Sequence, residues 1–533
     1  MKLRCLLVIP VLCASASFAA AQDVVARLAA IVQEQVKSDG PGVVALVVKD
    51  GKVLYRQAHG LADVAAKTPL RPETPFYVAS VAKSLTAACV IDLALAGKIA
   101  LDDEVRKFVP ELPEHCRGIS LRHLLHHRSG LRDFYELELL ASRQPGALTT
   151  RGVLDLLGRQ RALNFAPGAD FLYCNSGYLL LAEVVQRVTK KSLRTYANEQ
   201  LFAPLQMAST AFRDVDHPDV PGLPKSYDDG KEMPMPPLLC GAGGVCSTVD
   251  DLQRWLAALT SPQWRPELVR ELVTPPPLQP EQRRSPQFNP YAGGLLVTSV
   301  LEEPALLLLG GFFGWQATAL ALPASQLQVV LLANGDADAL GIARELASAV
   351  LDRREPARPA NSGRPGFALY RDDSGELLIH ATRGSGVSVF TTLGWKVEVA
   401  EQDGAFQSVD ARTPLTARRD ANGGIEMTVQ GERMRRYGAI TMGKVAPEDV
   451  ESIVGAWRGD EIDGDITLLA KGGRLQLDAS RMALPVAPFM PLDRDTWVSD
   501  SGMQIEVRRD ATGAPKELRV STARARGVSF VRN

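Results

Sequence analysis

The stretch from about residue 22 to residue 352 begins and ends with pairs of apolar strands, and helical patterns lie between them. Near its start, Val43–Val48 and Val53–Gln57 flank the turn Lys49-Asp50-Gly51-Lys52, which predicts a β-hairpin. Near its end, Ala317–Leu322 and Leu327–Ala333 form two further strands, and a helix over about 337–351 follows. This order predicts an α/β (α+β) domain. We expect a central antiparallel sheet, whose first and last strands meet, and an inserted helical region.

A different pattern follows this domain, for which we expect the bounds 22–354. Prolines, glycines and polar residues at 355–365 predict a linker. Beyond it, short alternating strands are separated by Gly, Asp and Asn turns, with little helical periodicity. We therefore expect two small antiparallel β-barrel or lipocalin-like modules, at 366–444 and 449–533.

The two expected modules share a short sequence pattern. The turn Arg418–Gly423 is echoed by Arg508–Gly513, and an alternating strand follows each turn. This spacing suggests a tandem repeat, although chance similarity of short charged turns is the alternative. Each unit then has a basic pair, which we interpret as part of a solvated strand face. The pairs are Arg435/Arg436 and Arg524/Arg526.

Residues 1–21 have the features of a secretory signal. Lys2 and Arg4 precede the apolar run Cys5–Cys13, which is too short to span a bilayer, and a small-residue stretch ends at Ala21. We therefore expect residues 1–21 to be cleaved and the protein to be exported, to the periplasm or the extracellular space. Because no second apolar run of about 20 residues follows, we expect no transmembrane anchor after cleavage.

Charge and cysteine content limit the expected partners. Lys plus Arg total 60 and Asp plus Glu total 61, so there is no electrostatic argument for a nucleic-acid partner. Two of the seven cysteines lie within the expected signal and are removed with it. The five that remain are an odd number and too few for a disulfide framework. Cys240 and Cys246 flank a glycine-rich turn, and the sequence leaves open whether they pair or stay as free thiols.

Three histidines, His123, His126 and His127, have a spacing that suggests metal binding. However, no carboxylate or cysteine partner is evident beside them, and the chain has no CxxC pair and no HExxH motif. Packing and helix-end hydrogen bonding explain these histidines better. We expect no metal site and no cofactor.

A serine and a lysine three residues apart open a strongly apolar stretch. Ser80-Val81-Ala82-Lys83 precedes Ser84–Ala96, which predicts a buried helix that stops at Gly97. Positions i and i+3 share a helix face, so the hydroxyl and the amine are expected side by side. Burial lowers the pKa of a lysine, so the amine can accept the serine proton, and backbone N–H groups at the helix start can stabilise an oxyanion. An N-cap serine followed by a solvated lysine is the alternative, because one such motif is expected by chance.

A second motif, Tyr173-Cys174-Asn175-Ser176-Gly177, lies in an expected polar turn before the apolar helix Tyr178–Val188. A tyrosine hydroxyl near a lysine and a serine can relay protons, and an asparagine amide can hold a substrate carbonyl. Tyrosine in a loop is usually a packing residue. The two motifs together predict Ser80, Lys83 and Tyr173 as catalytic residues and Asn175 as a substrate-binding residue.

These motifs carry a resemblance to a known family. Phe76–Ser84 and Tyr173–Tyr178 resemble the first two motifs of the penicillin-recognising serine hydrolases. That family includes class C β-lactamases, D-alanyl-D-alanine carboxypeptidases, serine D-aminopeptidases and β-lactamase-fold esterases. Residues 123–131 and 243–252 resemble further landmarks, and the resemblance covers nearly all of residues 30–352. Two β modules behind such a domain are similar to the serine D-aminopeptidases, in which a barrel loop can reach the active site.

The third motif of this family is Lys or His, then a small residue and Gly, on the strand that borders the cleft. The corresponding stretch here is Leu309-Gly310-Gly311-Phe312, with Leu309 in the basic position and the register after Gly311 open. Losing a charged hydrogen bond costs about 1.5–3 kcal/mol, which corresponds to a roughly 10- to 150-fold lower rate. Losing a serine nucleophile lowers the rate about a millionfold. We therefore expect reduced activity and weakened carboxylate recognition. The resemblance also implies that the edge Gly310, Gly311 and Phe312 binds substrate and supplies an oxyanion N–H.

The sequence thus predicts an exported serine hydrolase that forms an acyl-enzyme with an ester, an amide or a D-amino-acid peptide. The resemblance implies a small-molecule or peptide substrate, including cell-wall-derived ones. Ser80 is the expected nucleophile and Lys83 the general base, while Tyr173 protonates the leaving group and later activates water. A catalytically impaired binding or scaffold protein, and an envelope-anchored assembly protein whose β modules carry the function, are the alternatives. An α/β-hydrolase is disfavoured because no G-x-S-x-G motif occurs. The bond cleaved and the oligomeric state stay open.

Overall fold

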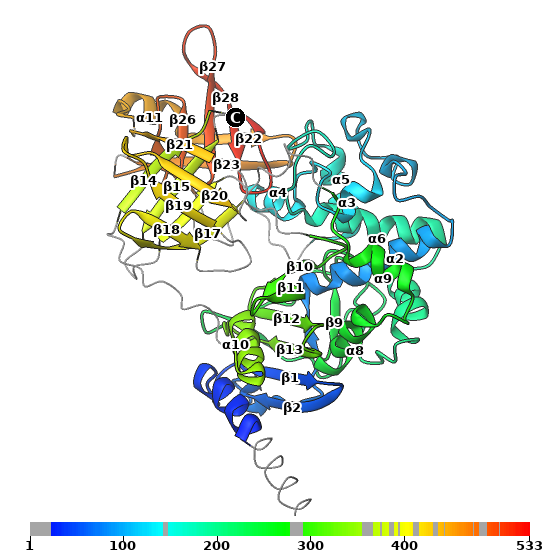
Figure 1. The fold of residues 1–533 in the computed structure, drawn as a ribbon. Helices are drawn as coiled ribbons and strands as arrows, with labels where there is room; N and C mark the ends of the chain where they lie inside the picture. The colour runs from blue at the N-terminus through cyan, green and yellow to red at the C-terminus, as the bar shows by residue number, and fades with distance from the viewer. Residues whose placement is uncertain are drawn as a thin grey trace, which may run out of the picture.

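The computed structural model falls into a first domain, a first β module and a second β module (Figure 1). The expected signal, 1–21, and the expected linker, 355–365, lie outside the described residues. The described residues are 23–141, 148–277, 291–353, 366–373, 376–382, 388–392, 395–408, 415–429, 435–441, 443–472, 474–478, 488–499 and 502–532.

The first domain is built on a six-stranded antiparallel sheet of order β10-β11-β12-β13-β1-β2. Its strands are β1 (Val43–Lys49), β2 (Lys52–His59), β10 (Leu296–Val300), β11 (Glu303–Phe312), β12 (Trp315–Leu322) and β13 (Leu327–Ala333). The predicted hairpin is β1–β2, and β1 also pairs with β13 along its whole length, from Val43↔Ala333 to Lys49↔Leu327. The expected meeting of the first and last strands is therefore confirmed.

Both faces of this sheet are buried, as the unbroken apolar run of β1 requires. Successive β1 side chains alternate between two clusters, with Val44 on one face and Val43 on the other. The cluster that includes Val43 is covered by the N-terminal helix, residues 23–35, and by α10 (Ala339–Leu351). The cluster that includes Val44 joins the sheet to the inserted helical region (Figure 1).

The helical region surrounds α2, whose residues are nearly all buried, as its apolar sequence predicts. The α-helices of this region are α2 (Ala82–Leu95), α3 (Leu121–Leu125), α4 (Phe134–Leu140), α5 (Thr150–Gly158), α6 (Asn175–Thr189), α7 (Leu193–Ala197), α8 (Val249–Thr260) and α9 (Pro266–Val273). Short strands lie between them: β3 (Leu61–Asp63), β4 (Thr68–Pro69), β5 (Phe76–Tyr77), β6 (Ala211–Phe212), β7 (Ser226–Asp228), β8 (Lys231–Met233) and β9 (Val245–Ser247). 3₁₀ turns form at Ala79–Val81, Val105–Lys107 and Glu114–Cys116, and a π-helical turn forms at Asn198–Phe202.

Two eight-stranded antiparallel modules follow, as expected. The first is a closed barrel of β14 (Gly366–Arg371), β15 (Leu377–Thr382), β16 (Ser388–Thr392), β17 (Trp395–Gln402), β18 (Ala405–Ser408), β19 (Leu415–Arg419), β20 (Ile425–Val429) and β21 (Arg435–Ile440). The second has the strand order β24-β23-β22-β29-β28-β27-β26-β25. Its elements are α11 (Pro447–Ile453), β22 (Gly455–Gly459), β23 (Gly464–Lys471), β24 (Arg474–Leu477), β25 (Met490–Pro491), β26 (Thr496–Val498), β27 (Gln504–Arg509), β28 (Pro515–Ser521) and β29 (Val528–Arg532).

The repeated sequence pattern forms the same turn in both modules. The Oδ1 atom of Asp420 accepts hydrogen bonds from the backbone N–H groups of Asn422 and Gly424, between β19 and β20. The Oδ1 atom of Asp510 accepts from Thr512 and Ala514 in the same way, between β27 and β28. The echo in the sequence is thus a shared hairpin turn.

The second β module packs directly on the first domain (Figure 1). Arg132 and Glu461 form an ion pair of 2.6 Å in which each side chain is 3% exposed. The Arg132 guanidinium also donates to the carbonyls of Arg526 and Gly527, which lie in the loop between β28 and β29. This loop, Thr522–Gly527, therefore belongs to the interface.

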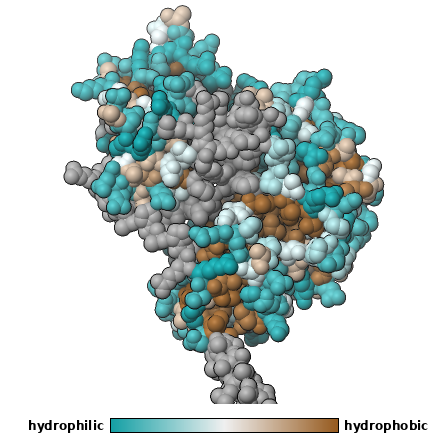
Figure 2. Space-filling model, viewed as in Figure 1, coloured by the Kyte–Doolittle hydropathy of each residue, from teal (hydrophilic) through white to brown (hydrophobic). Residues whose placement is uncertain are grey.

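The visible surface is mostly hydrophilic, and its larger hydrophobic areas lie over the first domain (Figure 2). None of the described helices has both the length and the apolar character needed to cross a membrane.

Candidate active site

Ser80 lies in the 3₁₀ turn Ala79–Val81, which leads directly into α2. The expected helix at Ser84–Ala96 thus begins earlier, at Ala82, and ends with Gly97 at a positive φ of 68°. Ala79 has a φ of 45°, in the left-handed region that non-glycine residues rarely adopt. Such backbone strain clusters at active sites, and here it immediately precedes Ser80.

Lys83 is fully buried on the first turn of α2. Its Nζ lies 3.1 Å from Ser80 Oγ and donates to Asn175 Oδ1 at 2.8 Å and to the Ala242 carbonyl at 2.7 Å. A neutral amine has two N–H donors and one lone pair. With both donors engaged by Asn175 and Ala242, the lone pair is left for the Ser80 hydroxyl.

The protonation state of Lys83 follows from its burial. Desolvation lowers the pKa of Lys83 to about 7, and this effect outweighs the opposing influence of Asp133. A large fraction of the amine is therefore neutral near pH 7 and can accept a proton.

Tyr173 lies just before α6, and its hydroxyl donates to Ser80 Oγ at 2.9 Å. Desolvation raises the pKa of Tyr173, so the phenol keeps its proton at neutral pH. The structure therefore brings the serine, the lysine and the tyrosine together, although Tyr173 is remote from the other two in sequence. Of these groups, Lys83 is the better proton acceptor and Tyr173 the better proton donor.

Asn175 begins α6, rather than lying in a turn before Tyr178 as expected. Its Oδ1 accepts from Lys83, and its Nδ2 donates to Asp133 Oδ2 at 2.9 Å. The second N–H of Nδ2 is the one that can hold a substrate carbonyl, because Asn175 also lines the pocket beside Ser80.

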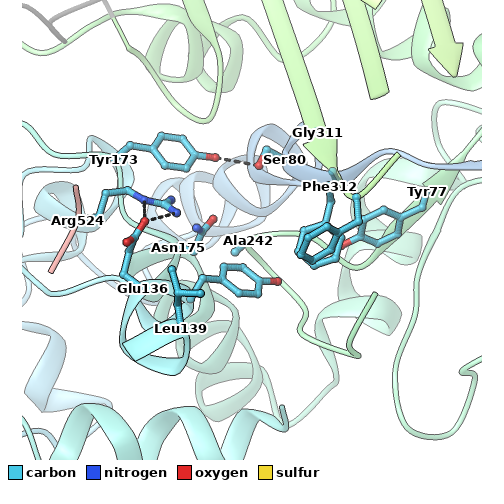
Figure 3. Close-up of a pocket in the computed structure, with 14 residues that line it drawn as sticks. Tyr77, Ser80, Glu136, Leu139, Tyr173, Asn175, Ala242, Gly311, Phe312 and Arg524 are labelled. Carbon is cyan, nitrogen blue, oxygen red and sulfur yellow. Dashed lines mark hydrogen bonds and ion pairs between the residues drawn. The ribbon is translucent and has the colours of Figure 1, made fainter. Parts of the chain in front are cut away.

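The pocket over Ser80 has a volume of about 340 Å³. Tyr77, Tyr135 and Phe312 form an aromatic wall, with ring centroids 5.7 Å apart for Tyr135 and Phe312 and 6.2 Å apart for Tyr77 and Phe312. In Figure 3, Phe312 and Tyr77 lie on one side of Ser80, and Tyr173 on the other. The pocket therefore suits an acyl compound with an apolar portion.

The β11 edge reaches the pocket through Gly311 and Phe312, and Phe313 in the turn that follows also lines it. The β11–β12 register continues unbroken to Phe312↔Trp315, which resolves the register left open by the sequence. β10 pairs with β11 only as far as Leu307, so among the described strands none covers the β11 edge beyond that point. The backbone of this edge is thus open toward Ser80.

Gly310 and Leu309 have different surroundings. A Cβ at Gly310 would lie 2.2 Å from the Val78 carbonyl and 3.3 Å from Ser80 N, so glycine lets the strand approach the nucleophile. Leu309, which occupies the expected basic position, packs against the apolar cluster that includes α10 and is not a lining residue of the pocket.

A cation nevertheless reaches the pocket from the second β module. Arg524 was expected on a solvated strand face with Arg526, but it lies in the β28–β29 loop and lines the pocket. Its guanidinium pairs with Glu136 on α4 at 3.1 Å (Figure 3) and with Asp133 at 3.4 Å. The expectation was wrong because this segment turns into the first domain instead of continuing a strand.

The other basic pair also departs from expectation in part. Arg435 is only 19% exposed and pairs with Glu376, whereas Arg436 is 73% exposed, as a solvated face requires.

The pocket residues that the sequence did not reveal include Tyr77, Tyr135, Glu136 and Arg524. Tyr77 lies within the first motif, so its position beside Ser80 was a usable signal. Glu136 and Arg524 carried no such signal, because tertiary docking alone brings them to Ser80.

The histidines and cysteines are engaged in packing and backbone contacts. His127 is fully buried, its Nδ1 accepts from the Cys174 N–H, and burial lowers its pKa well below the usual value. His123 forms a capping box with Ser120 at the start of α3. Cys240 and Cys246 are free thiols. In the described part of the chain, no three His, Cys, Asp or Glu residues gather as a metal site would require.

The antiparallel sheet, the helical region and the Ser80–Lys83 pair at the start of α2 define the class of penicillin-recognising serine hydrolases. A family model described as Beta-lactamase matches residues 28–351. Because this match spans more than half of the chain, the protein belongs to the Beta-lactamase family.

Individual relatives agree with this assignment. A D-aminopeptidase from Brucella canis is 25% identical over 516 residues, covering 92% of this chain and 96% of that protein. The structure of an octameric penicillin-binding protein homologue from Pyrococcus abyssi is similar at a TM-score of 0.57 and 21% identity, covering 78% of this chain and 99% of that chain. EstCE1, a hydrolase with promiscuous acyltransferase activity, is similar at a TM-score of 0.51 and 22% identity, covering 61% of this chain and 99% of that chain.

Proposed function

We propose that the protein is an exported serine hydrolase that acts through an acyl-enzyme on Ser80. The observation that carries this proposal is the contact of Ser80 Oγ with both the buried Lys83 amine and the Tyr173 phenol. A buried lysine with a lowered pKa beside a serine is the arrangement that activates a hydroxyl.

In acylation, Ser80 Oγ attacks the substrate carbonyl while its proton passes to Lys83 Nζ. The backbone at the Ser80 turn and at the open β11 edge supplies N–H groups to the developing oxyanion. Tyr173 then gives its proton to the leaving amine or alcohol, and the Lys83 ammonium restores the phenol. The products are a Ser80 ester and the free leaving group.

In deacylation, a water molecule attacks the Ser80 ester, and its proton passes to the Lys83–Tyr173 pair. Ser80 Oγ leaves and takes a proton back, which restores the enzyme and releases the acid. The same groups thus serve both steps in opposite directions.

For the substrate, we propose an ester, an amide or a D-amino-acid peptide. Its binding does not require a carboxylate that pairs with a Lys or His at the third-motif position, where this chain has Leu309. Leu309 supports this proposal because it offers no charge to a substrate carboxylate. The D-aminopeptidase relatives, which match along almost the whole chain, favour the D-amino-acid amide or peptide among these substrates.

Turnover of p-nitrophenyl butyrate, D-alanine p-nitroanilide and a chromogenic penicillin tests this proposal. We expect hydrolysis of at least one, and a loss of roughly a millionfold in Ser80→Ala. The exposed Ser38→Ala is the matched control and should keep full activity. If no substrate turns over, the alternative of a binding or scaffold protein replaces the proposal, whereas a Ser80→Ala variant that keeps its activity would show that Ser80 is not the nucleophile. N-terminal sequencing of the mature protein tests export, with Gln22 as the expected first residue.

A further inference from the structure

A continuous set of hydrogen bonds connects the second β module to the catalytic lysine. Arg524 pairs with Asp133, Asp133 accepts from Asn175, and Asn175 accepts from Lys83. The first of these residues lies in the loop Thr522–Gly527, and the last lies on α2.

Asp133 is the centre of this set and is 0% exposed. Its Oδ2 accepts from the Asn175 backbone N–H at 2.6 Å and from Asn175 Nδ2 at 2.9 Å, and it faces Arg524 at 3.4 Å. A buried carboxylate is costly unless it is paired and hydrogen-bonded. Arg524 provides the opposite charge, and Asp133 N in turn donates to the Arg524 carbonyl at 3.0 Å.

The Arg524 loop is held firmly in place by the first domain. Asn164 Nδ2 donates to the Arg524 carbonyl at 3.1 Å, and Arg526 N donates to Asn164 Oδ1 at 2.8 Å. The guanidinium also pairs with Glu136, so its position relative to Asp133 is fixed from two sides.

The contact with Asp133 decides which end of the Asn175 amide faces Lys83. An ionised carboxylate only accepts hydrogen bonds, so it selects the Nδ2 end and leaves Oδ1 for the lysine. We propose that Arg524 is a positioning residue of the catalytic centre, supplied by the second β module, which holds Asp133 and thereby orients Asn175 toward Lys83. The inference rests on the proposed function of Lys83 as the general base.

The charges around Lys83 give this proposal a measurable signature. Desolvation is the main cause of the lowered Lys83 pKa, while Asp133 raises the pKa and Arg524 lowers it. The titratable groups that face Lys83 from the surrounding elements are His127, Asp133, Tyr173, Cys174, Tyr178 and Arg524. Removing Arg524 therefore raises the Lys83 pKa, and removing the Asp133 charge lowers it.

The test is the pH dependence of kcat/KM for Arg524→Gln and Asp133→Asn, beside thermal unfolding of each variant. We expect the rise in kcat/KM to move to higher pH in Arg524→Gln, and because the parent pKa is about 7, a move by one pH unit would lower kcat/KM at pH 7 by about fivefold. In Asp133→Asn the rise should move to lower pH. Arg458→Gln, which removes an exposed arginine of the same module that pairs with Asp463 and Asp465, is the control and should keep the parent profile.

Opposite displacements of the two profiles separate positioning from a merely structural role, because loosening of the fold would not move them in opposite directions. Arg524→Lys, which keeps the charge, should restore at least part of the parent profile. The inference is wrong if Arg524→Gln folds and keeps the parent profile, or if both variants move in the same direction. The Ser80→Ala control distinguishes the two proposals. If Ser80→Ala is active, the proposed function is wrong. If Ser80→Ala is inactive and Arg524→Gln keeps the parent pH profile, only the inference about Arg524 is wrong.

Discussion

Lys83 shows how a single buried side chain sets the chemistry of the pocket. It is enclosed by Tyr173, Tyr178 and the Ala242 carbonyl, and its amine has no exposed surface. His127 lies nearby, with its ring 4.3 Å from that of Tyr173, but burial keeps it neutral and its Nδ1 is used by the Cys174 backbone. The base of the proposed reaction is therefore the lysine.

The pH dependence of the parent enzyme follows from this environment. The base form of Lys83 is the neutral amine, so kcat/KM should rise as pH increases through about 7 and level off above it. One pH unit below that value, about a tenth of the plateau is expected. Steady-state kinetics between about pH 5 and pH 11 measures the profile. If kcat/KM rose only near pH 10, where an ordinary lysine titrates, burial would not activate Lys83.

At this scale the sequence predicted the placement of Ser80 beside Lys83 well and the surroundings of this pair poorly. The i, i+3 spacing of Ser80 and Lys83 is a local property of a helix start, so it could be derived from the chain alone. The role of Arg524 could not, because its contact with Asp133 joins residues 391 positions apart. Glu136 was missed for the same reason.

Among the elements, β11 determines how closely the backbone approaches the nucleophile. Gly310→Ala should lower stability by about 1–3 kcal/mol, because the added Cβ would lie 2.2 Å from the Val78 carbonyl and force β11 away from the Ser80 turn. Gly311→Ala is the matched control on the same strand, since a Cβ there meets no described atom within 4 Å. Denaturant unfolding measures both variants. Equal stabilities would contradict the close approach of β11 to Ser80.

The elements that the sequence predicted best are those with strong local patterns. The β1–β2 hairpin, β12 and β13 match the expected segments closely, because alternation and turn chemistry are local signals. The start of α6 was misplaced by three residues, since Asn175 and Ser176 are polar yet buried by tertiary hydrogen bonds. Patterning alone cannot reveal such contacts.

For the whole molecule, the interface between the second β module and the first domain contains a buried ion pair, Arg132–Glu461. Glu461→Ala leaves the buried Arg132 guanidinium without its carboxylate, so a loss of about 3–5 kcal/mol of stability is expected. Asp460→Ala is the control, because its pair with Arg161 is 64–65% exposed and contributes no more than about 1 kcal/mol. Chemical denaturation compares the two adjacent variants. Similar small losses would mean that the Arg132–Glu461 pair does not hold the interface.

The domain order and the two modules were predictable from the pattern, and the resemblance to serine D-aminopeptidases implied that a barrel loop can reach the active site, but the residue through which the second module does so was not predictable. The sequence shows a change from helical patterns to short strands, and the shared turns at Asp420 and Asp510 mark the repeat. Nothing in that pattern indicates that the second module, through Arg524, completes the pocket of the first domain. This contact arises only when both parts are folded.

The central claim is that Ser80 is the nucleophile of this pocket and becomes covalently modified by its substrate. Mass spectrometry of the intact protein after incubation with a fluorophosphonate, followed by peptide mapping, tests it most directly. The account predicts a single adduct on the peptide that contains Ser80, and no adduct in Ser80→Ala. An unlabelled protein, or an adduct on another residue with Ser80 unmodified, would contradict it.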